Sequence, residues 1–316
     1  MTKDATLQTF HGEPTLRFER RLAHPPAKVW RAVSDPAEMA HWFPAKVEAE
    51  LRPGAPMRFV FPEESTVDDA SDGEVLEVDP PRVFAFRWNS DVLRFELIPD
   101  GDGCLLVFTQ TIGGGRVGLL GAGRTAAGWD TCLDELAGSL DGAPVPARAD
   151  WLGQVEHYID KFGLGEGTVR DTGDGYELHF ARDLVWKPVG EVWRLLVEDT
   201  TPSMGVEPPT RATNAYVQAG KVTAVDPPRL LEYEWSHDGT PAGKVRWEIF
   251  SDPRLGVRVE LTQTLPRQSA HLLPTSLAAW HVQLELFFAA THGDIRCPWP
   301  EDRTDQLIKY YATQRT

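Results

Sequence analysis

Apolar and polar side chains alternate along several short stretches of the chain. Stretches with an apolar residue at every second position include 84–88, 231–235, 245–249 and 257–261. A period of two residues is typical of a strand that buries one face. Short connections rich in Asp, Asn and Gly follow some of these stretches, as at 89–91 and 99–103, and favour antiparallel pairing.

A helical period replaces this alternation further along. Trp129, Leu133, Leu136 and Leu140 recur at spacings of three and four residues, as do Trp280, Leu284 and either Phe287 or Phe288. A shorter helix is predicted over 27–33, after two prolines suited to a first turn. The order strand, short helix, antiparallel strands and long helix predicts an α+β module with a helix laid on one face of a curved sheet.

This order occurs twice, because the sequence is an internal duplication. The segment GEVLEVDPPRVFAFRW at 73–88 matches GKVTAVDPPRLLEYEW at 220–235. Three further matches keep the same order along the chain. They are Pro25, Val29, Trp30 and Arg31 with Pro188, Val192, Trp193 and Arg194; Arg94 and Glu96 with Arg246 and Glu248; and Thr109, Gln110 and Thr111 with Thr262, Gln263 and Thr264.

We therefore expect two tandem domains, at 1–166 and 176–316, joined by a linker at 167–175 that has few core-forming residues. The repeats differ in their first halves. Trp30 precedes Gly73 by 43 residues, whereas Trp193 precedes Gly220 by only 27. The second repeat is thus expected to have a reduced pocket, or to serve as a platform.

Composition excludes several classes of protein. The net charge of −15 argues against nucleic-acid binding, which needs a basic surface. The three cysteines form no CxxC pattern, so we expect no disulfide framework, no zinc site and a reducing, cytoplasmic location. No stretch is long and apolar enough to predict a signal peptide or a membrane span, so we expect no membrane association.

Several residues then carry a resemblance to a known family. They are Leu22, Pro25, Val29, Trp30, Asp35, Pro36, Trp42, Gly73, Val75, Asp79, Pro80, Pro81, Trp88, Gly128, Trp129 and Leu133. The pattern resembles the AHSA-type branch (activator of heat-shock-protein ATPase homologue) of the SRPBCC superfamily, the START-like helix-grip fold. This resemblance implies a cavity between sheet and long helix that holds a hydrophobic small molecule. Because the sequence shows no coherent catalytic set, we expect no metal or organic cofactor.

Aromatic residues on the inner sheet faces either line such a cavity or form a packed core. The candidates in the first repeat are Trp42, Phe43, Phe59, Phe61, Phe84, Phe86, Trp88, Phe95, Phe108, Gln110 and Trp129. Those in the second are Tyr233, Trp235, Trp247, Gln263 and Trp280. Gln110 and Gln263 point inward by parity, where each amide either bonds a neighbouring group or orients the polar end of a ligand.

Two further features carry competing interpretations. His281 and Glu285 lie four residues apart on the predicted long helix and could form a general-base pair or half a metal site, although no third ligand is evident.

The glycine-rich stretch 113–123 lacks the Lys and Ser or Thr of a phosphate loop. We expect it to be a flexible loop at the pocket mouth. The resemblance to enediyne-resistance proteins offers a second interpretation, in which its backbone meets a radical warhead.

These observations favour binding or sequestration of a hydrophobic, aromatic or polyketide-like molecule, in natural-product biosynthesis or self-resistance. A cofactor-independent cyclase or hydrolase using Gln110 or His41 is an alternative. A chaperone-associated interaction module is another. No catalytic set is identified, and a protein partner cannot be named from the sequence.

Overall fold

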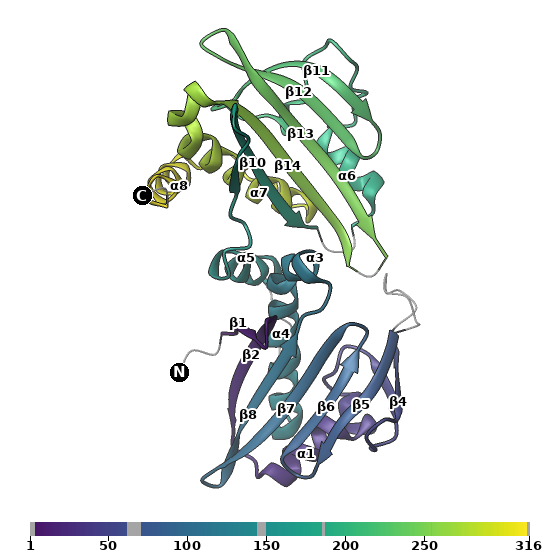
Figure 1. Ribbon diagram of the computed structural model, residues 1–316. Helices are drawn as coiled ribbons and strands as arrows, with labels where there is room; N and C mark the ends of the chain where they lie inside the picture. The colour runs from purple at the N-terminus through teal and green to yellow at the C-terminus, as the bar shows by residue number, and fades with distance from the viewer. Residues whose placement is uncertain (1–3, 62–70, 144–149, 185–186, 254, 315–316) are drawn as a thin grey trace. The chain divides into compact units, whose positions relative to one another are not determined.

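The computed structural model describes residues 4–61, 71–143, 150–184, 187–253 and 255–314. It divides into two compact units, Met1–Phe162 (unit 1) and Gly163–Thr316 (unit 2). Both have the expected α+β architecture, an antiparallel sheet with a long helix against one face (Figure 1). The chain therefore consists of two tandem helix-grip modules.

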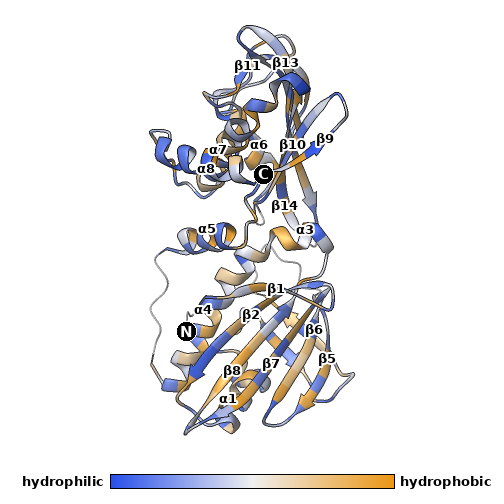
Figure 2. Ribbon diagram, turned by 60° about the vertical axis from the view of Figure 1, so that its left-hand side comes forward, coloured by the Kyte–Doolittle hydropathy of each residue, from blue (hydrophilic) through white to orange (hydrophobic). Residues whose placement is uncertain are grey.

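Unit 1 contains an eight-stranded sheet in the order β1-β2-β8-β7-β6-β5-β4-β3. Its strands are β1 (Thr6–Phe10), β2 (Glu13–Leu22), β3 (Lys46–Ala49), β4 (Pro56–Val60), β5 (Ser71–Asp79), β6 (Val83–Trp88), β7 (Asp91–Asp100) and β8 (Gly103–Thr111). Its helices are α1 (Pro26–Ser34), α2 (Pro36–Met39), α3 (Gly115–Leu120), α4 (Ala122–Asp141) and α5 (Trp151–Lys161). The inner sheet face packs on α4, and apolar and polar residues alternate within single strands (Figure 2).

Unit 2 contains a six-stranded sheet in the order β11-β12-β13-β14-β10-β9. Its strands are β9 (Thr168–Asp171), β10 (Gly175–Asp183), β11 (Gln218–Asp226), β12 (Leu230–His237), β13 (Thr240–Asp252) and β14 (Gly256–Pro266). Its helices are α6 (Val189–Leu196), α7 (Leu273–Thr291), α8 (Glu301–Thr313) and two short 3-10 turns, η1 (Thr210–Ala212) and η2 (Arg267–Leu272). The stretch assigned to a linker, 167–175, contains β9 and its turn to β10.

The shortening of the second repeat has a structural counterpart. In unit 1, β4 and β3 extend the sheet beyond β5, but the described part of unit 2 has no strand beyond β11. There, Val206 accepts a hydrogen bond from Val222, and then Pro208 and Pro209, which have no N–H to donate, precede η1. The prolines end the edge pairing, and the chain turns into the interior.

The glycine-rich stretch is not the flexible loop we expected. It forms α3 and the first turn of α4. A Cβ on Gly118 would lie 1.9 Å from the carbonyl oxygen of Gly113, and one on Gly123 would lie 2.8 Å from the Ile159 side chain. Close packing explains glycine at these two positions, because any side chain would force neighbouring backbone apart.

Candidate functional site

A pocket of about 390 Å³ opens in unit 1 between the segment after α2 and strand β4. Its lining residues are Ala40, Phe43, Pro44, Ala45, Lys46, Val60 and Phe61. All but Lys46 are apolar, and the volume lies within the range of small-molecule sites. Two of the predicted cavity residues, Phe43 and Phe61, belong to this lining.

A ladder of stacked aromatic rings joins Phe61 to Phe43, both of which line the pocket. Phe61 stacks on Trp88 with ring centroids 5.8 Å apart, and Trp88 stacks on Phe59 at 4.7 Å. Phe59 in turn stacks on Phe43 at 6.0 Å. Phe61 and Trp88 are half-buried, so the outer end of the ladder remains accessible to a further flat ring.

The remaining predicted aromatic residues of unit 1 pack against one another. Phe84, Phe86, Phe95 and Phe108 are at most 1% exposed, and Trp42 and Trp129 at most 5%. Phe108 stacks on Phe95 with centroids 4.6 Å apart and meets the edge of Trp129 at the same separation. These rings fill the space between the sheet and α4 with their own contacts, as expected for the packed-core alternative.

Gln110 points inward as its parity predicts, and both ends of its amide are engaged. Its Nε2 donates to Asp91 Oδ2 at 2.5 Å, and its Oε1 accepts from the indole N–H of Trp129. Asp91 Oδ1 also accepts from the backbone N–H of Gly113 at 2.8 Å. Burial raises the pKa of Asp91, although these two hydrogen bonds act in the opposite direction.

A buried ionic network joins α4, α5 and β2, and the sequence analysis missed it. Asp130 accepts from Arg20 Nη2 at 2.5 Å through one oxygen. Through the other it accepts from the Tyr158 hydroxyl at 2.5 Å and from Gln154 at 3.0 Å. Asp130 follows Trp129 directly, but its partners lie far away in the sequence, so periodicity alone could not identify them.

A comparison with known protein families matches part of unit 1. Residues 23–141 match the family described as activator of Hsp90 ATPase homolog 1-like protein (AHSA1). We refer to unit 1, which contains the residues similar to this family, as the AHSA1-like domain. The match begins just before α1 and ends at the last residue of α4, so it includes the pocket and the aromatic ladder.

Solved structures resemble single modules of the chain. A conserved protein of unknown function from Enterococcus faecalis is 20% identical, with a TM-score of 0.44, and the match covers 50% of this chain and 90% of that one. CalU16 from Micromonospora echinospora is 18% identical, with a TM-score of 0.39 and coverage of 51% and 95%. A protein from Mesorhizobium loti is 27% identical, with a TM-score of 0.36 and coverage of 42% and 99%. No curated protein matched the chain.

The candidate cavity residues of unit 2 make different contacts from those of the AHSA1-like domain. The Tyr233 hydroxyl and the Trp247 indole both donate to the backbone carbonyl of Ala212, at 2.6 and 3.0 Å. Ala212 belongs to η1 and is fully buried, so the turn after the two prolines occupies part of the interior. Trp235 donates to the carbonyl of Thr264 at 2.8 Å. Three of the predicted residues are therefore engaged by the unit's own backbone.

Gln263 is the counterpart of Gln110. Its Oε1 accepts from Trp280 at 2.7 Å, which repeats the pairing of Gln110 with Trp129. Its Nε2 is buried and has no hydrogen-bond partner among the described residues. The cause is a substitution in the partner strand, because Gly243 pairs with Trp235 where Asp91 pairs with Trp88 in the AHSA1-like domain.

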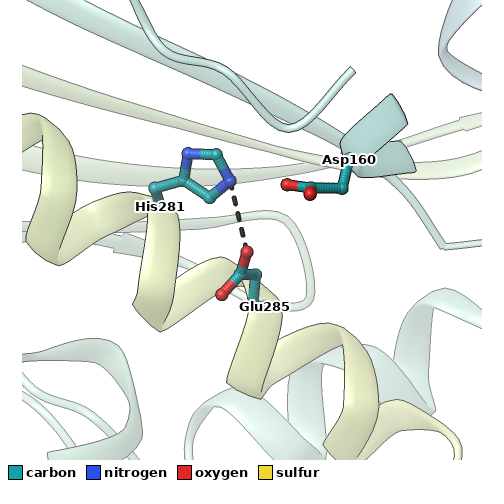
Figure 3. A group of neighbouring side chains, drawn as sticks. All are labelled: Asp160, His281 and Glu285. Carbon is teal, nitrogen blue, oxygen red and sulfur yellow. Dashed lines mark ion pairs between the residues drawn. The ribbon is translucent and has the colours of Figure 1, made fainter. Parts of the chain in front are cut away.

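His281 and Glu285 form an ion pair one turn apart on α7, with Nε2 and Oε1 3.3 Å apart (Figure 3). His281 Nδ1 also contacts the Tyr311 hydroxyl at 2.8 Å, and Arg303 Nη2 lies 2.7 Å from Glu285 Oε1. Through Tyr311 and Arg303, which lie on α8, this pair connects α7 to α8 within unit 2. Burial alone would raise the pKa of Glu285, but His281 and Arg303 together lower it to about 2.

This shift predicts an acid sensitivity of unit 2. A carboxyl with a lowered folded-state pKa stabilises the fold above its unfolded value of 4.5, and that contribution is lost as the pH falls towards about 2. Glu285→Gln should therefore destabilise unit 2 by about 2 kcal/mol at pH 7, after a discount for the partial exposure of the carboxylate, and by much less at pH 2. Urea unfolding at several pH values, with hydrogen exchange of α7 and α8 peptides as the readout, measures this. An equal loss at both pH values would contradict the role assigned to the ion pair.

No helix among the described residues is long and apolar enough to cross a membrane.

Proposed function

We propose that the AHSA1-like domain binds a hydrophobic, aromatic small molecule in the pocket lined by Ala40, Phe43–Lys46, Val60 and Phe61. One observation supports this above the others: an apolar pocket of about 390 Å³ lies at the accessible end of a ladder of stacked rings. A flat ligand ring placed on Phe61 would continue the stack and remove apolar surface from water.

The ligand class follows from the lining. Six of its seven residues are apolar, and Lys46, 3.0 Å from Glu48, supplies the single charged side chain. Such a site favours a planar, mostly apolar compound such as an aromatic polyketide. Binding without chemical change would serve sequestration, in biosynthesis or in self-resistance to a natural product.

The enzymatic alternative has less support. Gln110, one of its two candidate groups, already uses both ends of its amide on Asp91 and Trp129. His41, the other, is exposed beside the pocket and is not among its lining residues. Association with a chaperone rests only on the description of the matched family. We therefore advance ligand binding alone.

Titration with the tricyclic anthraquinone emodin tests the proposal in the full-length protein. Because Phe61 stacks on Trp88, we expect a saturable change in tryptophan fluorescence on binding. Phe61→Ala should weaken the affinity about tenfold, which corresponds to losing about 1.4 kcal/mol of stacking and burial.

Phe10→Ala provides the matched control, since it removes another phenyl ring that is 56% exposed on β1 and is not among the residues lining the pocket. It should leave the affinity unchanged. Saturable binding that both variants weaken equally, or no saturable binding at all, would refute the proposed site.

A further inference from the structure

A second pocket lies in unit 2, between α6 and the end of α7. It has a volume of about 280 Å³, and Val192, Leu195 and Ala290 supply its apolar surface. Four charged side chains also line it, Lys187, Glu191, Arg194 and Asp199. None of the four side chains makes an ion pair or a hydrogen bond with another described residue.

At the equivalent place in unit 1, a lysine of the first helix contacts the end of the long helix. There Lys28, on α1, donates from Nζ to the carbonyl oxygen of Leu140 at 2.6 Å, at the end of α4. His24 lies 3.3 Å from the same ammonium and pairs with Asp141 at 2.6 Å. The last carbonyls of a helix carry partial negative charge, so the Lys28 ammonium satisfies them.

The duplication shows what changed in unit 2. The match of Pro25 and Trp30 with Pro188 and Trp193 aligns Lys28 with Glu191, and the match of Trp129 with Trp280 aligns Leu140 with Thr291. Thr291 is the last residue of α7 and lines the pocket. A carboxylate therefore stands in unit 2 where unit 1 has the Lys28 ammonium, and the same match places Lys187 at the position of His24.

We propose that this pocket binds a small zwitterion. Its ammonium group would take the place of Lys28, between the carboxylates of Glu191 and Asp199 and the end of α7. Its anionic group, a carboxylate or a similar acid, would pair with Lys187 and Arg194. The four side chains sum to zero charge, so a ligand carrying both signs matches the lining better than an ion of either sign alone.

Three probes of equal length test the ligand class by calorimetric titration of the full-length protein: 5-aminopentanoate, pentylamine and pentanoate. We expect saturable binding of 5-aminopentanoate, at least about tenfold tighter than that of either singly charged probe, because each of those leaves one charged pair of the pocket unmatched. Absence of binding by all three, or equal affinity for pentylamine and 5-aminopentanoate, would overturn the proposal.

The variant Glu191→Lys tests the location, because it restores the ammonium that unit 1 carries. It should abolish binding of 5-aminopentanoate and leave unit 2 folded, as read from hydrogen exchange of the α6 and α7 peptides. Glu234→Lys makes the same change of charge at an exposed residue of β12 outside this pocket, and it should leave binding intact. Undiminished binding in Glu191→Lys would place the ligand elsewhere. This test involves no residue of the aromatic pocket, so its failure is independent of the function proposed for unit 1.

Discussion

Asp130→Ala is expected to destabilise unit 1 by about 3–5 kcal/mol, the range for breaking a buried ion pair by removing one partner. The side chains of Arg20 and Asp130 are 7% and 4% exposed, so the substitution would leave a guanidinium buried without its carboxylate. The Tyr158 hydroxyl and the Gln154 amide would lose their acceptor as well. Because these contacts hold α5 in unit 1, α5 should lose its protection from hydrogen exchange before the sheet does.

Hydrogen exchange of unit 1 peptides in the full-length protein measures this loss, and unit 2 peptides serve as an internal reference. Arg82→Ala is the matched control, because Arg82 pairs with Asp79 while 70% of its side chain is exposed. Exposed pairs contribute little to stability, so this variant should unfold like the wild type. Equal effects of the two variants would mean that the Asp130 network does not hold α5 in place.

Phe108→Ala is expected to cost a similar amount, about 3–5 kcal/mol, because it opens a cavity at the centre of the ring cluster. Phe108 is fully buried and contacts the rings of Phe18, Phe95 and Trp129. Urea unfolding followed by the exchange of β7 and β8 peptides measures the loss.

Phe61→Ala provides the contrast. Phe61 is only half-buried at the outer end of the ladder, so its removal should cost unit 1 much less stability while weakening the binding of emodin. This pair of variants separates rings that hold the fold together from rings that meet a ligand. A Phe108→Ala protein as stable as the wild type would indicate that these rings line an unfilled cavity instead of a core.

Much of the fold could be predicted because it rests on local patterns. The alternation over 84–88 and 231–235 places β6 and β12, and the helical spacing after Trp129 and Trp280 places α4 and α7. The duplication then assigns the same architecture to both halves. The inward direction of Gln110 followed from strand parity alone.

Other features depend on contacts that no local pattern contains. The partners of Asp130 come from β2 and α5. Asp91, the first residue of β7, accepts a hydrogen bond from the backbone of Gly113, which follows β8. Glycines in 113–123 suggested flexibility, yet tight packing against backbone and Ile159 explains two of them. The burial of Ala212 likewise follows from where the chain goes after Pro208 and Pro209, which composition cannot show.

Methyl NMR of the full-length protein tests the proposed aromatic site most directly, because Ala40, Ala45 and Val60 line the pocket and each carries a methyl group. Val217 and Ala212, buried in unit 2, provide reference signals. On titration with emodin, we expect saturable shifts at Ala40, Ala45 and Val60, with none at Val217 or Ala212. Saturation that leaves the three pocket methyls unmoved would contradict it.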